Sequence, residues 1–244
     1  MGKRVLNELI DAVDPAWPLI QGWIDAAHHS VEVLDVNQVR ADEVLLSLQV
    51  TTRSPLGAVA FKTGGMLIDQ GWLRFLGSGH ERMHGDLLSW NTKGDILESH
   101  LLNNALVVAH DAVGGFFALN GGAFPGRPGG AFYFAPDTLE WKNTNLSYSQ
   151  LLNWAMAGNL ALFYENMRWP GWEQDISTLE GDKGIAFYPF LWANREIPIV
   201  KRSRRAVPME ELWRLHVDLA QQLKDLPEGT PIRVNFEDNS PSNE

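Results

Sequence analysis

Cysteine is absent from the 244-residue sequence. Its absence excludes disulfide bonds, thiolate zinc sites and a cysteine nucleophile, and it fits a reducing compartment. Long apolar runs are missing too, since no stretch approaches the roughly 18 uncharged residues of a transmembrane helix. The opening MGKRVLNELIDAVD acquires acidic side chains too soon to hold the apolar core of a signal peptide. We therefore expect a cytoplasmic protein that does not enter membranes.

Positive charge is scarce. The sequence has 20 Lys and Arg against 30 Asp and Glu, which gives a formal net charge of −10. Nucleic-acid binding depends on neutralising phosphates, so this balance argues against a nucleic-acid partner. A local exception is the basic group at Lys201, Arg202, Arg204 and Arg205. We expect this group at the surface, either as a solvated loop or as a docking site for an acidic partner.

Aromatic side chains are abundant, with 10 Trp and 11 Phe. Such a content fits either a well-filled core or an aromatic-rich binding face. The chain length suffices for one large domain, and no linker is long enough to separate two. We predict a single α+β domain over 1–228, followed by a mobile acidic and polar tail over 229–244.

Apolar spacing and cap residues predict the secondary structure. The predicted helices cover about 5–14, 15–27, 37–49, 55–63, 147–167 with a break at 158–159, a short segment ending near 179, and 208–223. The predicted strands cover 30–36, 66–68, 72–76, two runs within 105–141, and 185–192 at a sheet edge. The glycine-rich segment 121–130 joins two strand-like runs, so we interpret it as a hairpin loop and not as a phosphate-binding loop. Together these elements predict a mixed or antiparallel β-sheet flanked by helices.

Residues 80–84 read HERMH and fit the H-E-x-x-H pattern of zinc proteases. In that pattern two histidines one helical turn apart hold zinc, and the glutamate between them activates a water molecule. Gly77, Gly79 and Gly85 bracket the pattern here. Because glycines disfavour the long helix that this chemistry requires, the sequence favours a polar surface loop.

A third zinc ligand is missing from its familiar places. The longer zinc-protease pattern needs Gly at 87 and His at 90, where this chain has Leu87 and Trp90, and Glu98 is the nearby acidic candidate. We therefore predict no metal site. A zinc-dependent hydrolase stays as an alternative, and it would use the residues of the motif, His80, Glu81 and His84.

Other catalytic arrangements are also incomplete. Ser78 lies in the sequence GSG, which is not the G-x-S-x-G turn of hydrolases. His110 and Asp111 are adjacent, so on a strand their side chains point to opposite faces. We predict no catalytic residue and no cofactor.

Several stretches resemble a family of bacterial proteins that is classed as a domain of unknown function. They include TTRSPLGAVAFKTGGMLIDQGWLRFLGSG, VGGFFALNGG and FYFAPDTLEW, and the resemblance covers about 5–225. The middle of the chain, about 50–168, more remotely resembles the SUKH superfamily, whose bacterial members are mostly immunity proteins against secreted toxins. This second resemblance rests on Gly64 and Gly65 ending a helix, strands at 116–119 and 132–134, and a helix from Ser149. It implies a non-catalytic α+β core, to which helices before 50 and a C-terminal addition at 169–228 are appended.

The leading functional hypothesis is a non-enzymatic protein that binds another protein, in its narrower form an immunity or toxin-neutralising protein. An acidic surface would steer association with a basic toxin. Exposed aromatic and arginine side chains near loops often dominate interface energy. The predicted binding residues are Trp72, Arg74, Trp90, Phe124, Arg127 and Trp141. A small-molecule binding protein is a further alternative, and the oligomeric state is left open.

Overall fold

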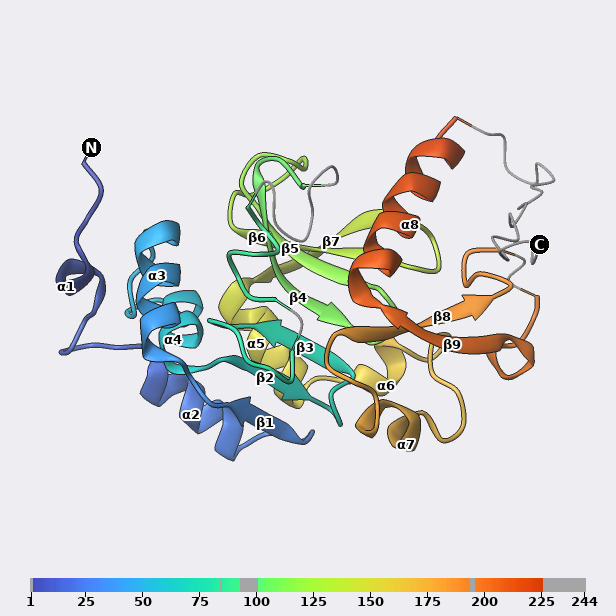
Figure 1. Ribbon diagram of the computed structural model, residues 1–244, viewed down its shortest axis with the longest axis horizontal. Coiled ribbons are helices and arrows are strands. Elements are labelled where there is room, and N and C mark those ends of the chain that lie inside the picture. Colours follow the sequence, from blue (N-terminus) through green and yellow to red (C-terminus); the bar gives the residue numbers. More distant parts are fainter. Residues whose placement is uncertain (1, 84, 93–100, 194–195, 226–244) are drawn as a thin grey trace, which may run out of the picture.

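The computed structural model describes residues 2–83, 85–92, 101–193 and 196–225. These residues form a seven-stranded sheet, a separate two-stranded sheet and the helices labelled in Figure 1. The predicted α+β class, with a sheet flanked by helices, is confirmed. No helix within these ranges has the length and apolar character needed to cross a bilayer. The tail at 229–244 lies outside the described residues, and the division into a core and a C-terminal addition stays a prediction.

The strands of the large sheet pair in the order in which they occur along the chain. They are β1 (Val31–Leu34), β2 (Gly65–Ile68), β3 (Leu73–Leu76), β4 (Ala105–Asp111), β5 (Phe116–Asn120), β6 (Gly130–Ala135) and β7 (Glu140–Ser147). Every neighbouring pair is antiparallel, so of the two predicted sheet types the antiparallel one is present. Residues 121–129 form the loop between β5 and β6, so the predicted hairpin loop is present and Gly130 is the first residue of β6.

Most helices begin and end close to where the sequence predicts them, but the helix predicted over 5–14 ends at Leu9 and the one predicted to reach 167 ends at Phe163. The helices are α1 (Leu6–Leu9), α2 (Trp17–Asp25), α3 (Gln38–Leu48), α4 (Pro55–Lys62), α5 (Tyr148–Ala157), α6 (Leu160–Phe163), α7 (Trp172–Ser177) and α8 (Met209–Leu223). Local caps account for this agreement. The Ser54 hydroxyl accepts a hydrogen bond from the Gly57 amide at the start of α4, and Asn159 caps α6 directly after the predicted break.

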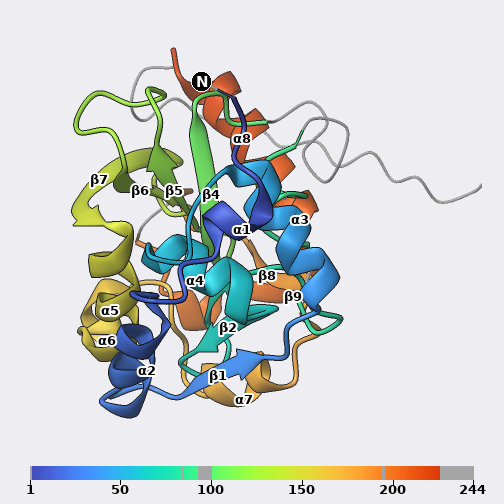
Figure 2. The same ribbon diagram turned by 90° about the vertical axis from the view of Figure 1, so that its left-hand side faces the viewer.

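The two faces of the large sheet are covered by different helices. Adjacent residues of a strand point to opposite faces. The Phe116 ring lies 4.6 Å from the Trp213 ring of α8, whereas the Phe117 ring lies 6.3 Å from the Trp154 ring of α5. Helix α8 therefore covers one face at β4–β7, and α5 covers the other, as Figure 2 shows from the side.

The small sheet is a hairpin of β8 (Lys183–Tyr188) and β9 (Ser203–Pro208). A short 3-10 helix at Ile199–Lys201 lies in the connection between the two strands. The strand predicted over 185–192 is too long at its end. It stops at Tyr188 because Pro189 has no amide hydrogen with which to continue the ladder.

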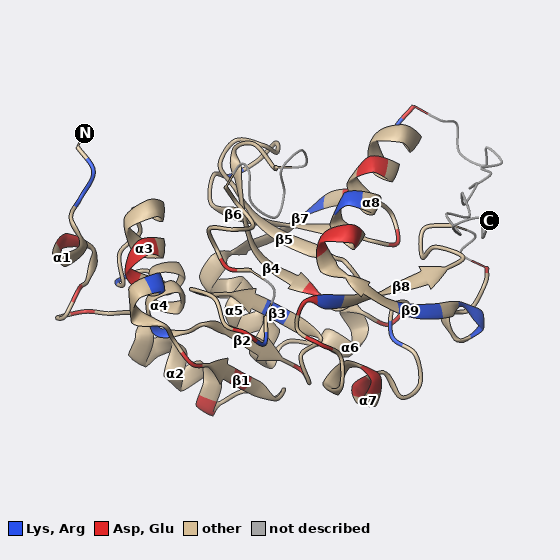
Figure 3. Cartoon of the chain, in the orientation of Figure 1, with Lys and Arg blue, Asp and Glu red and all other residues tan. Residues whose placement is uncertain are grey.

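The basic group lies at the start of β9, the second strand of this hairpin. Arg204 and Arg205 are exposed on β9, where Figure 3 shows the basic stretch in blue. The predicted exposure of Arg202 is wrong, since that residue is 5% exposed. Its guanidinium donates to the backbone carbonyls of Pro189 and Ala193, so it holds the loop between the two strands.

Candidate functional site

Three of the predicted binding residues are buried, and the expectation that they lie at the surface is wrong. Trp72 and Trp90 are 0% exposed, and Arg74 is 2% exposed. Trp72 directly precedes β3 and packs against a group of rings on and near α6 and α7: Tyr164, Trp169 and Trp172, with centroid separations of 5.0–5.9 Å. The Trp90 ring packs between His110 and Phe116. Both Trp72 and Trp90 therefore belong to the core.

The other three predicted residues remain together at the surface. Phe124 and Trp141 are half-buried with ring centroids 4.8 Å apart, and Arg127 is exposed in the same loop as Phe124. The Phe124 ring also stacks on Phe132 at 4.5 Å. We call the surface formed by Phe124, Arg127 and β7 the aromatic edge.

A cavity of about 800 Å³ lies at the opposite end of the sheet. Its floor is a row of side chains across three strands, because Glu32 pairs with Leu67 and Leu67 pairs with Arg74. Residues opposite each other on neighbouring strands share a face, so all three side chains point the same way. The row continues through His110 toward Phe116, where α8 begins to cover it. The cavity is thus the part of this face that α8 leaves open.

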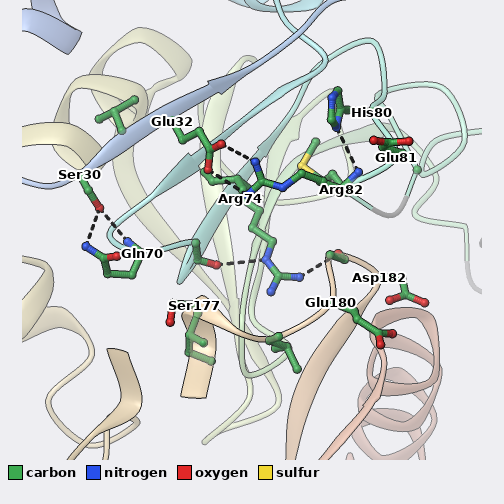
Figure 4. Close-up of a pocket in the computed structure, with 18 residues that line it drawn as sticks. Ser30, Glu32, Gln70, Arg74, His80, Glu81, Arg82, Ser177, Glu180 and Asp182 are labelled. Atoms are coloured by element: carbon green, nitrogen blue, oxygen red, sulfur yellow. Dashed lines mark hydrogen bonds and ion pairs between the residues drawn. The ribbon is translucent and has the colours of Figure 1, made fainter. Parts of the chain in front are cut away.

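Two loops form the walls of the cavity. One is the turn 80–83, which contributes His80, Glu81, Arg82 and Met83, and the other is the segment 176–182, which runs from the end of α7 to the start of β8. Figure 4 shows Arg74 between the Glu32–Arg82 pair and the loop that carries Glu180 and Asp182. Residues that the sequence assigned to two separate hypotheses, Arg74 and the HERMH motif, therefore line one cavity.

The Arg82 guanidinium forms a bidentate ion pair with the Glu32 carboxylate. This hydrogen bonding lowers the pKa of Glu32 and raises the pKa of Arg82. Both side chains are about half exposed, at 52% and 53%, so the pair orients the turn and adds little to stability. It also neutralises one carboxylate and one guanidinium of the cavity.

Arg74 is held rigidly by the backbone. Its Nε donates to the Gly71 carbonyl at 3.1 Å, and its Nη1 donates to the carbonyls of Gly181 and Lys183, each at 2.9 Å. None of these acceptors carries a full charge. Burial lowers the pKa of Arg74 to about 10, which leaves the guanidinium protonated at neutral pH. The cavity therefore has a fixed cation at its floor.

The motif at 80–83 forms a turn and not a helix. The Met83 amide donates to the His80 carbonyl at 3.0 Å, and the Arg82 amide donates to His80 Nδ1 at 3.1 Å. The predicted surface loop is consistent with this geometry, while His84 and Glu98 lie outside the described residues. Among the residues that the structure describes, no group of three or more His, Asp or Glu is placed to hold a metal ion.

A family model matches residues 6–212 of this chain. The chain belongs to the DUF2625 family, a family of proteins of unknown function. It is 41% identical over 218 residues to YbfG, an uncharacterized protein of Escherichia coli (strain K12), covering 89% of this chain and 98% of that one. It is 37% identical over 207 residues to an uncharacterized protein of Haemophilus influenzae, covering 85% and 91%. No solved structure gives a significant match, and the resemblance to the SUKH superfamily stays a prediction.

The sequence of this DUF2625 chain did not point to most of the residues that line the cavity. It did not single out Glu32, Arg82, Glu180 or Asp182, which come from three separate segments. The strand pattern of VEVL could have placed Glu32 on one face of a strand. Only the pairing of β1 with β2, and of β2 with β3, places it in the same row as Arg74.

The DUF2625 chain is expected to carry no stoichiometric zinc when it is purified without an affinity tag. The reason is that His80 already presents Nδ1 to a backbone amide and lies in a turn, whereas the zinc-protease motif requires its histidine on a helix. Elemental analysis of the wild type and of His80→Ala tests this. Stoichiometric zinc that disappears in His80→Ala would instead establish the hydrolase alternative.

Proposed function

We propose that this protein is a non-enzymatic interaction domain that binds an extended segment of a partner protein along the aromatic edge. The observation that carries the proposal is the open side of β7. Within the described residues this eight-residue strand is paired on one side only, with β6. An edge strand can add a further strand through its unpaired backbone groups, and this is a common mode of peptide recognition.

Side chains beside β7 supply what such an interface needs. Phe124 and Trp141 offer half-buried rings, and Arg127 offers an exposed guanidinium. Aromatic and arginine side chains are enriched among residues that dominate binding energy. A small hollow of about 120 Å³, lined by Arg127, Asn143 and Leu146 among others, can accept one side chain of the added strand.

The edge is also protected against indiscriminate pairing. A bulge interrupts the β6–β7 register between Ala131 and Phe132, and Asn145 has a left-handed φ of 60°. Bulges and exposed charges such as Lys142 limit edge-to-edge aggregation. Selective binding of one partner is therefore compatible with a soluble chain.

The double substitution Phe124→Ala and Arg127→Glu is expected to reduce partner binding about tenfold or more, because each of the two changes removes a dominant interface group. A photo-crosslinking residue at exposed Asn143 reports binding in cells as an adduct of defined mass. The double substitution should strongly reduce this adduct. Circular dichroism and thermal unfolding confirm that the variant is folded.

Two controls make this test specific. Arg53→Glu reverses a charge on a side chain that is 68% exposed and lies between α3 and α4, outside the aromatic edge, and it should leave the adduct unchanged. A crosslinker at Val39, which is 72% exposed on α3, should not yield the same adduct. An adduct that is insensitive to the double substitution, or equal from Val39, would contradict the proposal.

An immunity or toxin-neutralising role is the narrower form of this proposal. Its support is the net charge of −10, which favours electrostatic steering toward a basic partner. The captured protein should then be basic, and its toxicity in cells should be suppressed by the wild type and not by the double variant. Capture of a partner without toxicity would limit the function to binding.

A further inference from the structure

We propose that the cavity over Arg74 binds a small zwitterion, an amino acid or a dipeptide. Its carboxylate would accept hydrogen bonds from the Arg74 guanidinium, and its ammonium group would face the carboxylates of Asp182 and Glu81. This site is separate from the aromatic edge, and the inference does not depend on the protein-interaction proposal.

The first argument is the unsatisfied nitrogen of Arg74. Nε and Nη1 donate to three carbonyls, but Nη2 has no hydrogen-bond partner among the described residues. The side chain is 2% exposed and lines the cavity, so an acceptor for this nitrogen would have to lie in the cavity. Figure 4 shows the guanidinium with this nitrogen outside the two drawn hydrogen bonds. Nη2 is therefore the guanidinium nitrogen that is left to donate to a ligand oxygen, and such charge-assisted hydrogen bonds are among the stronger ones in proteins.

The second argument is the charge of Arg74. No carboxylate of the described residues lies within salt-bridge distance of its guanidinium, although Asp111 and Asp182 are near enough to raise its pKa against the effect of burial. A buried charge without a directly bonded counter-ion is strongly unfavourable. A bound carboxylate would supply that counter-ion, and its two oxygens suit the planar donors of arginine.

A purely structural role does not account for all of this geometry. Arg202 shows what that role looks like, since it also donates to several backbone carbonyls and holds a loop. Arg74 holds the segment 181–183 in the same way. Arg202 also lines a cavity, of about 450 Å³, but Arg74 lies on the floor of the larger one of about 800 Å³, and its Nη2 makes no hydrogen bond with the described residues.

The mouth of the cavity favours a cation. Glu81 and Asp182 are exposed lining residues, and the carboxylate of neither forms a salt bridge or hydrogen bond with another described residue. Glu180 adds a third carboxylate, which Lys183 neutralises at 2.7 Å. An ammonium group beside these carboxylates is stabilised, whereas a multiply charged anion such as a nucleotide is repelled. A zwitterion is the ligand class that suits both a cationic floor and an anionic mouth.

The walls are fixed and partly apolar. A Cβ atom on Gly181 would lie 1.8 Å from the Arg82 carbonyl oxygen, so the two wall loops touch through their backbones and exclude any side chain at 181. Leu67 and Leu179 add apolar surface to the lining. The volume falls within the roughly 300–1,000 Å³ that is usual for small-molecule sites, which leaves room for an apolar side chain of the ligand.

The experiment measures binding of the proteinogenic amino acids and a set of X-Leu dipeptides to the full chain, by thermal shift and then by calorimetry. We expect at least one of these zwitterions to bind at a single site. Its C-terminal amide and its N-acetyl form should each bind about tenfold more weakly or worse, because each loses one charged contact. Succinate and inorganic phosphate serve as probes that carry negative charge alone.

Substitutions tie the binding to the cavity. Arg74→Lys should weaken binding about tenfold or more, since lysine keeps the charge and loses the planar fork. Asp182→Asn, at an exposed position, should weaken it severalfold without affecting folding. The matched control is Glu173→Gln, which removes an exposed acid on α7 outside the cavity and should leave affinity unchanged.

Several results would overturn the inference. They are that no amino acid or dipeptide binds, that succinate or phosphate binds as well as the best zwitterion, or that the amide or acetyl form binds equally. Affinity that is unchanged in Asp182→Asn overturns it even if Arg74→Lys fails to fold. The aromatic-edge variant with Phe124→Ala and Arg127→Glu should retain full zwitterion binding, so failure of one proposal does not imply failure of the other.

Discussion

Replacing Trp72 with alanine is expected to lower the free energy of unfolding by about 3–5 kcal/mol. The side chain is fully buried, and its ring is surrounded by Tyr164, Trp169 and Trp172. The Arg168 guanidinium lies 4.7 Å from the Trp72 ring centroid. Truncation would therefore leave a large cavity lined by rings and would also remove a cation–π contact.

Chemical denaturation of Trp72→Ala and of a surface control measures this effect. Leu162→Ala is the control, because that side chain is 62% exposed on α6 and its truncation should cost no more than about 0.5 kcal/mol. If Trp72→Ala unfolds like the wild type and loses partner binding instead, the residue would belong to an interface as the sequence alone predicts. Equal stability of both variants would contradict the packing described for β3 and α6.

Lowering the pH from 6.5 to 4 is expected to remove about 3 kcal/mol of stability through His216 alone. Its imidazole is 6% exposed, and burial lowers its pKa from 6.5 to about 4. Below pH 6.5 the unfolded chain binds a proton that the folded chain does not. This contribution to stability is therefore complete above pH 6.5 and is lost as the pH falls toward 4.

The geometry explains why the folded state keeps His216 neutral. Its Nδ1 lies 3.1 Å from the Gly114 carbonyl, so Nδ1 carries the proton of the neutral ring and donates it there. The ring packs closely on the turn, since a Cβ atom on Gly114 would lie 2.8 Å from the His216 ring. A charged imidazole would have to lose its hydration in this position.

The difference between two pH profiles isolates the histidine. His216→Gln should show a smaller loss of stability between pH 6.5 and 4 than the wild type, measured by denaturation at each pH. The matched control His28→Gln alters an exposed histidine and should retain the wild-type profile. Parallel profiles for His216→Gln and the wild type would contradict the assignment. Asp111 acts in the opposite direction, because burial raises its pKa, but it is common to all three proteins.

The helices and strands were predictable because their signals are local. The Ser54 side chain caps α4 by accepting a hydrogen bond from the amide three residues later in the sequence. Asn159, which lies in the predicted break, caps the start of α6 in the same way. His110 and Asp111 also behave as adjacent strand residues should, one packing on Phe116 and the other bonding to Tyr133 on the opposite face. Each of these features depends on side chains only a few residues apart.

The candidate sites were less predictable, because burial depends on which layer covers a residue. Trp72 directly precedes β3 and Trp141 lies in β7 of the same sheet, yet the first is fully buried and the second is half-buried. Trp72 meets rings from residues 164–172, whereas Trp141 lies on an edge strand. Nothing in the residues next to either tryptophan records that difference.

Composition, periodicity and cap residues determined the α+β class, many of the element boundaries and the absence of disulfides, since these follow from residue types and short-range spacing. Only the tertiary structure decided that Arg74 would be a buried cation facing a cavity. That outcome requires the pairing of β1 with β2 and of β2 with β3. It also requires the contact between the turn 80–83 and Gly181. The physical reason is that a side chain's solvation and charge partners come from segments about a hundred residues away, such as Gly181, whose carbonyl accepts from Arg74 across 107 positions.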